Sequence, residues 1–168
     1  MHDPEQNWMY TYKCKLVDNY DGDSVTLNID LGLRTWRLHE KARLYSVDTP
    51  ELRGDLKEFG IFVRDELENF IAEHTSSGYE LLCETHKDRS GKFGRFLVTL
   101  HLVNEEEERG INVNSWLVEN KYAVSYFGES KDAIQAKHLE NWAHVSQVLV
   151  KRANAMDSTY KSQPTRSS

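Results

Sequence analysis

Hydrophobic and polar positions alternate along several segments of the chain, as they do in half-buried β-strands. The clearest case is 24–30, where Val25, Leu27 and Ile29 alternate with polar residues. A segment near the middle of the chain repeats the pattern with Phe, Val and Leu against Arg, Thr and His. The alternation and the turn residues between segments predict five strands, at 12–17, 24–30, 35–47, 79–85 and 94–103.

Three other segments place apolar residues at helical spacing. The first predicted helix opens with Asp55 as N-cap and Glu58 three residues later, the arrangement of a capping box. Its core-facing stripe is predicted to comprise Leu56, Phe59, Val63, Leu67 and Phe70. The other two helices are predicted at 112–119, with Asn120 as a left-handed C-cap, and at 131–152. Strands followed by interleaved helices predict an α+β fold, a small antiparallel barrel closed by three helices.

A chain of 168 residues is long enough for one domain with its own core. We predict that domain at 12–153, between an N-terminal arm at 1–11 and a flexible polar tail at 154–168. The two cysteines, Cys14 and Cys83, fall in predicted strands, where a small buried thiol is the common role. We therefore expect both to be reduced.

Composition narrows the class of protein. With 39% hydrophobic and 29% charged residues, the chain is typical of soluble globular proteins and unlike fibrous or disordered ones. It has no apolar run of the length that crosses a bilayer, and no basic and apolar leader at its start. We expect a cytoplasmic protein, or a secreted one if a leader has been removed. The net charge of −6 disfavours a nucleic-acid partner, although a site needs only a local positive field.

Two acidic motifs are candidates for chemistry. In the first, Asp21 and Asp23 flank Gly22, a pattern that supplies hard oxygen ligands but is more often only a turn. The second is less common: a strand ends at Arg43, and the residues Asp48-Thr49-Pro50-Glu51 follow shortly after it. Proline there restricts the threonine before it to an extended conformation and stiffens a corner rich in acids.

A basic loop at 87–95 supplies the opposite charge. Its glycines allow close approach of the backbone to a ligand, and Lys92 and Arg95 can bind phosphate. Phosphodiester cleavage needs an activated, oriented water and neutralisation of the charge that builds up on phosphorus. One metal ion, one carboxylate and two arginines meet those needs, and the three motifs together offer these components.

The motifs Asp-Gly-Asp-Ser at 21–24, Arg43 to Glu51 and Gly-Lys-Phe-Gly-Arg at 91–95 resemble, in order and spacing, those of the staphylococcal nuclease (thermonuclease) family. The resemblance covers roughly residues 12–150. It implies a five-stranded OB-type antiparallel barrel with three helices. It also implies a Ca²⁺-dependent nuclease that cuts DNA or RNA, prefers unpaired strands and leaves 3′-phosphate ends.

By position, the resemblance assigns the side chains of Asp23 and Asp48 and the carbonyl of Thr49 to the metal ion. Asp21 corresponds to an acid beside the metal rather than on it. Ca²⁺ is the expected ion, with Mg²⁺ or Mn²⁺ as alternatives.

The remaining site residues are assigned in the same way. Arg43 and Arg95 would bind the cleaved phosphate, and Glu51 would orient or deprotonate the attacking water. Three residues are expected to contact substrate: Lys92, Phe93 and Tyr126. Phe93 stands where the family commonly has tyrosine, and the base-stacking tyrosine of the family maps onto either Tyr126 or Phe127.

Two other functions fit the same pattern. One is a catalytically silent module that binds nucleic acid or protein on the same barrel, but such copies usually lose the acids or the arginines, which this chain keeps. The other adds a protein partner that docks on the acidic surface or the C-terminal region. We assign no histidine to the site, since the seven show no paired ligand spacing, and His138 and His144 are six apart on one predicted helix.

Overall fold

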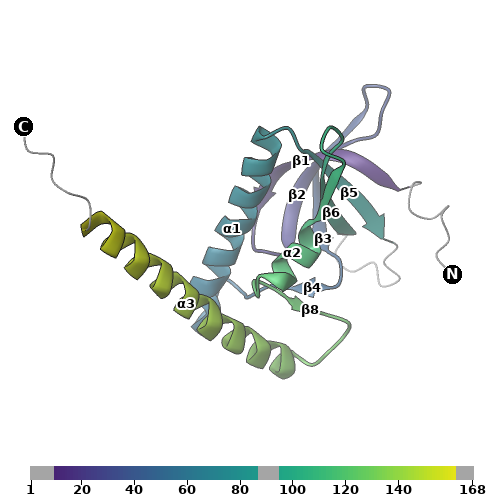
Figure 1. Cartoon of the computed structure of the whole chain (residues 1–168). Helices are drawn as coiled ribbons and strands as arrows, with labels where there is room; N and C mark the ends of the chain where they lie inside the picture. The colour runs from purple at the N-terminus through teal and green to yellow at the C-terminus, as the bar shows by residue number, and fades with distance from the viewer. Residues whose placement is uncertain (1–9, 87–94, 162–168) are drawn as a thin grey trace, which may run out of the picture.

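The computed structural model describes residues 10–86 and 95–161. Five of its strands wind into a closed barrel (Figure 1). They are β1 (Thr11–Asn19), β2 (Ser24–Asp30), β3 (Trp36–Leu44), β5 (Glu80–His86) and β6 (Phe96–Asn104). The sheet order is β3-β2-β1-β5-β6, and a parallel pairing of β3 with β6 closes it. This closure confirms the predicted OB-type α+β fold.

The remaining elements decorate the barrel. The short strands β4 (Val47–Asp48) and β8 (Val124–Ser125) pair with each other, and β7 (Arg109–Asn112) extends the edge at β6. The helices are α1 (Lys57–Ser76), α2 (Val113–Glu119) and α3 (Lys131–Lys161). No helix in the described ranges combines the length and apolar character needed to cross a membrane.

The predicted alternation forms the core. Val25, Leu27 and Ile29 are at most 4% exposed and belong to the same buried cluster as the apolar residues of α1. Of the predicted α1 stripe, all but Phe70 are buried, and Phe70 stacks on Trp116 with ring centroids 3.8 Å apart. Full burial of each such side chain stabilises the fold by about 1.5–3 kcal/mol, so these contacts fix the helix against the sheet.

The ends of two helices differ from prediction. Asp55 does not cap α1: it lies in a 3-10 turn (Gly54–Leu56), and Leu56 occupies the N-cap position without a side-chain hydrogen bond. Leu56 is only 2% exposed, so its burial, and not a capping box, sets where the helix begins. Asn120 is not left-handed, with φ −84°; the next residue, Lys121, takes that conformation with φ 62°.

The long strand predicted at 35–47 is interrupted. It ends at Leu44, and a turn at Tyr45 and Ser46, with Ser46 at φ 54°, separates β3 from β4. The turn is held on both sides, because the amide of Tyr45 donates to Val98 and the amide of Tyr126 donates to the carbonyl of Ser46. The chain is thereby redirected to pair with β8.

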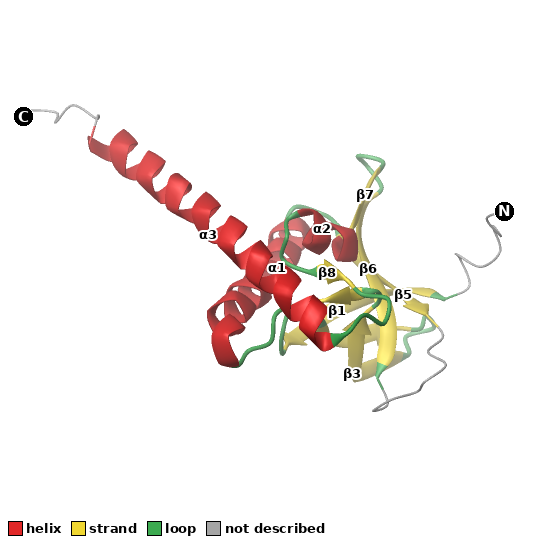
Figure 2. Ribbon diagram, turned by 90° about the horizontal axis from the view of Figure 1, so that it is seen from below, coloured by secondary structure: helices red, strands yellow, loops and turns green. Residues whose placement is uncertain are grey.

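The third helix is longer than predicted. Its first half packs on the barrel through Ile134, His138 and Val145, which are buried, and through Trp142, which stacks on Phe59. The helix then continues to Lys161, and every residue of 151–161 is exposed. Figures 1 and 2 show this second half extending away from the barrel. Elsewhere, both cysteines are buried and free, as expected.

Candidate functional site

The Asp-Gly-Asp turn joins β1 to β2. The Oδ1 atom of Asp21 accepts hydrogen bonds from the amides of Ser24 (2.7 Å) and Asp23 (3.2 Å), so Asp21 caps the turn, as such motifs commonly do. Gly22 lies so close to Thr49 and Val63 that an added Cβ would sit 2.7 Å from a methyl carbon of each. Only glycine lets the turn pack this tightly against the second acidic corner.

The buried acid of this turn is Asp23, which is 7% exposed. Its Oδ2 atom accepts a hydrogen bond from the amide of Thr49 at 3.1 Å. Burial raises the pKa of Asp23 to about 7, and the neighbouring Asp21 adds to the rise, while Arg43 and the Thr49 amide oppose it. The folded protein therefore holds a carboxylate whose charge is incompletely compensated, which is the environment that a bound cation would relieve.

The second acidic corner is fixed against α1. Pro50 and Thr49 are buried, while Glu51 is exposed. A Cβ on Gly60 of α1 would stand 2.8 Å from the carbonyl oxygen of Pro50 and 2.7 Å from that of Glu51. This close approach holds the corner rigidly at the mouth of the barrel.

Arg43 brings the two acidic motifs together. Its Nη2 atom lies 3.3 Å from Oδ2 of Asp48 and 3.6 Å from Oδ2 of Asp23. The guanidinium carbon also lies 5.6 Å from the ring centroid of Tyr126, within the range of cation–π attraction. Two carboxylates thus face a single cationic group, and the aromatic ring limits where that group can move.

His138 belongs to the site, although sequence analysis assigned it no role there. From the buried face of α3 its Nε2 atom donates to Oδ1 of Asp48 at 2.8 Å, and the ring is 3% exposed. The other ring nitrogen, Nδ1, is buried with no hydrogen-bond partner among the described residues. No local pattern signalled this contact, because the two residues are 90 positions apart and meet only when α3 packs on β4 and β8.

Two further predicted residues lie at the rim. Glu51 is 61% exposed by its side chain, and its carboxylate accepts from Nε of Arg53. That hydrogen bond is the main reason why the pKa of Glu51 is lowered from its ordinary value. Arg95 immediately precedes β6, and Arg43 pairs with Leu97 in the closing β3–β6 ladder. The register therefore places Arg95 beside the end of β3 that carries Arg43.

Three of the predicted residues were expected to contact substrate. Lys92 and Phe93 lie outside the described residues. Tyr126 borders Arg43, as noted, while the alternative Phe127 is 78% exposed and follows β8. Of the two aromatic residues, Tyr126 is the one next to the acidic and basic groups.

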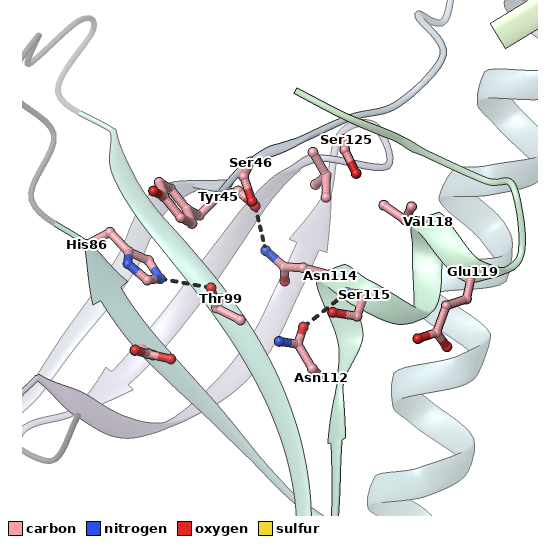
Figure 3. Close-up of a pocket in the computed structure, with 12 residues that line it drawn as sticks. Tyr45, Ser46, His86, Thr99, Asn112, Asn114, Ser115, Val118, Glu119 and Ser125 are labelled. Carbon is pink, nitrogen blue, oxygen red and sulfur yellow. Dashed lines mark hydrogen bonds between the residues drawn. The ribbon is translucent and has the colours of Figure 1, made fainter. Parts of the chain in front are cut away.

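A separate pocket of about 460 Å³ contains none of the predicted site residues (Figure 3). Its polar groups largely bond to each other and to the backbone: Asn114 donates to the carbonyls of Tyr45 and Val98, and His86 is bonded to Thr99 at 2.8 Å. The ring of His86 also stacks on Tyr45. These contacts brace the β3–β4 turn, which gives the pocket a structural role next to the site.

The donors at the site suit a hard cation. Oxygen ligands from carboxylates and carbonyls are those that Ca²⁺ and Mg²⁺ prefer. Asp23 and Asp48 both turn their Oδ2 atoms toward Nη2 of Arg43, so the two oxygens lie close together. The hydroxyl of Thr49 is buried without a hydrogen-bond partner in the described part of the chain. No three His, Cys, Asp or Glu side chains converge there within the described residues, so water and carbonyl groups would complete the coordination.

Comparison with known proteins adds one match. The model of the family described as "Staphylococcal nuclease homologue" matches residues 41–160, which include Arg43, Asp48, Glu51, Arg95 and His138. Comparison with proteins of curated function gives no match. The matched segment exceeds half of the chain. It begins near the end of β3 and includes β5, β6 and all three helices, whereas β1 and β2 precede it. This chain therefore belongs to the staphylococcal nuclease homologue family.

Proposed function

We propose that this protein is a metal-dependent nuclease that hydrolyses phosphodiester bonds of DNA and RNA, with Ca²⁺ as the expected ion. The observation that supports the proposal most directly is the position of Arg43 between Asp23 and Asp48. A guanidinium group has five N–H donors, so one that faces two carboxylates through Nη2 is held in place and could still offer other N–H groups to a phosphate.

Each residue has a distinct task in this proposal. Asp23 and Asp48, with the carbonyl of Thr49, would hold the cation. Bound there, the cation would lower the pKa of a water molecule and neutralise negative charge on the phosphate. Arg43 and Arg95 would bind the phosphate oxygens and stabilise the extra charge of the transition state.

Glu51 would act on the attacking water. Its lowered pKa keeps the carboxylate ionised at neutral pH, so it can accept a hydrogen bond from water and orient it. A carboxylate of low pKa is a weak base, which favours an orienting role over full deprotonation. We expect the products to carry 3′-phosphate ends.

A binding module without catalysis is the alternative. Charge offers it little support, because the chain carries a net charge of −6 and phosphate binding by itself needs an extensive positive surface. A nuclease needs positive charge only around the reacting phosphate, and in this proposal Arg43 and Arg95 would supply it.

The decisive experiment compares the wild type with Glu51→Ala on denatured DNA and on RNA, in Ca²⁺ and in excess chelator. We expect the wild type to cleave only with the metal, and the variant to be slower by about 10²–10⁴-fold, the usual contribution of a positioned acid or base. Gel analysis of end-labelled substrate measures both rates. Because Glu51 is exposed, the fold of the variant should be unchanged.

Glu68→Ala serves as the matched control, since Glu68 is an exposed acid on α1 away from the site. Its rate should equal that of the wild type. Equal and negligible cleavage by all three proteins across metals and pH, with oligonucleotide binding retained, would favour the binding module instead.

His138 gives a second prediction about the same site. By donating to Oδ1 of Asp48 it leaves Oδ2 directed toward Arg43 and Asp23. Groups that orient a metal ligand typically contribute about 10–100-fold to metal affinity. His138→Ala should weaken Ca²⁺ binding by about that factor in a calorimetric titration.

His138→Gln is the informative companion variant, because its amide nitrogen can take the place of Nε2 and donate to the same oxygen. We expect it to recover most of the Ca²⁺ affinity. If both variants bind Ca²⁺ as the wild type does while losing stability, His138 only fills space between α3 and the barrel.

A further inference from the structure

The outer face of the β1–β2–β3 sheet continues directly from the candidate site. Buried residues of β2 alternate with outward ones, and the register pairs the outward Ser24 with Arg43 and Thr26 with Lys41. Since cross-strand partners point to the same side of a sheet, Arg43 and Lys41 share this outer face. Lys41 is exposed, so positive charge extends along β3 away from the two acids.

Farther along β3 the same face becomes apolar and aromatic. A bulge at His39, with φ 56°, interrupts the pairing with β2, and beyond it Leu38 is 59% and Trp36 39% exposed. Lys15 of β1 lies over the Trp36 ring, 5.6 Å from its centroid. The turn of the β2–β3 hairpin, which precedes Trp36, lies at the opposite end of the barrel from β4 and β8 (Figure 1).

We call the five residues of this face the β3 track: Lys15, Trp36, Leu38, Lys41 and Arg43. Three cations and an exposed tryptophan line up here on a chain whose net charge is −6. Asp30 is the acid paired with Trp36, and its Oδ1 atom is engaged by the amide of Gly32 at 2.8 Å. Asp18 of β1 is exposed and pairs with Thr26, so it shares this face as well. The track is thus a row of three cations beside two acids, Asp18 and Asp30, with an aromatic surface at its far end.

We propose that the β3 track binds the unpaired strand of a nucleic acid beyond the cleaved phosphate, with a base stacked on Trp36. This inference rests on the proposed nuclease function. Seven residue steps of β3 separate Arg43 from Trp36, a span of about 20 Å, which several nucleotides would cover. Lysines would contact the phosphates, and an aromatic face accepts any base, so the track would bind without reading sequence.

Continuity with the site favours nucleic acid over a membrane surface. Lys41 connects Trp36 to Arg43 on one strand, which a membrane contact would not require. The side chain most suited to lipid is Leu33, which is 100% exposed at the hairpin tip between Gly32 and Arg34. It is separate from the track and therefore serves as a control.

The first test is direct binding, measured in chelator so that no cleavage occurs. Fluorescence anisotropy of a labelled single strand of roughly 20 nucleotides would be compared for the wild type, Trp36→Ala and Lys15→Glu. We expect each variant to bind about tenfold more weakly, the usual effect of losing one stacked base or reversing one phosphate-contacting charge. Lys151→Glu, the same charge change on the exposed end of α3, and Leu33→Ser should bind as the wild type does.

The second test separates the track from catalysis. The ratio of kcat/KM for the long strand to that for a strand of roughly four nucleotides should fall about tenfold in Trp36→Ala. Unchanged binding and an unchanged ratio in both track variants, with cleavage intact, would refute the track and leave the nuclease proposal standing. If the wild type cleaves neither strand, the nuclease proposal fails. The anisotropy measurements alone then show whether the β3 track binds nucleic acid.

The same proteins would also be mixed with phosphatidylserine vesicles. Vesicle binding that Leu33→Ser abolishes, together with equal oligonucleotide binding by all variants, would overturn the proposal in favour of a membrane contact.

Discussion

Arg43→Ala should lower kcat/KM on single-stranded DNA by about a thousandfold. Preorganised cationic donors at a reacting phosphate commonly contribute this much, since they act on charge that appears only in the transition state. Arg43 is well placed for that role because Asp48, at 3.3 Å, and the ring of Tyr126 hold its guanidinium group in position. Steady-state kinetics at saturating Ca²⁺ measures the loss.

Arg43→Lys tests whether geometry or charge matters. Lysine keeps the charge but lacks the planar fork, so we expect it to restore about tenfold of the lost activity and no more. Arg64→Ala, which removes an arginine from α1 that pairs with Asp65, should retain wild-type kinetics. Activity of Arg43→Ala above about a tenth of wild type would mean that Arg43 only neutralises the two acids and does not contact the reacting phosphate.

The barrel could be predicted because its strands are half-buried. Val25, Leu27 and Ile29 alternate with polar residues, and this period depends only on which side of a strand faces the core. The interruption after Leu44 was not predictable in the same way. It depends on hydrogen bonds that Tyr45 and Ser46 form with strands distant in the chain.

The candidate site was predictable where its residues are close together in sequence, and not where they meet across the fold. The Asp-Gly-Asp turn and the corner at Asp48 could be identified from their residue types and spacing. The contact of Asp48 with His138 depends on the angle at which α3 crosses the barrel, which no local pattern encodes. The pairing of Glu51 with Arg53 likewise follows from side-chain geometry at an exposed corner.

The second large effect that we predict is a change in stability, and it comes from replacing the buried acid Asp23. Burial raises its pKa to about 7, well above the ordinary value of 3.8 that it regains on unfolding. Between these two values the folded protein binds a proton that the unfolded chain has released, so this group stabilises the fold at low pH. That stability is lost as pH rises through about 7, because the folded protein must then hold a buried carboxylate ion.

Asp23→Asn should therefore make the metal-free protein more stable at pH 8, by roughly 1–3 kcal/mol, and this advantage should shrink steadily as the pH falls to 5. Urea unfolding in chelator between pH 5 and 8 measures the free energy of unfolding of both proteins. Subtracting the value of the wild type from that of the variant at each pH cancels the contributions of the other titrating groups. Added Ca²⁺ should stabilise the wild type but not the variant, since only a folded site with both carboxylates binds the ion tightly. A variant that is less stable than the wild type at pH 8 would show that Arg43 and the Thr49 amide already compensate the charge of Asp23. The site would then have no unsatisfied demand for a cation.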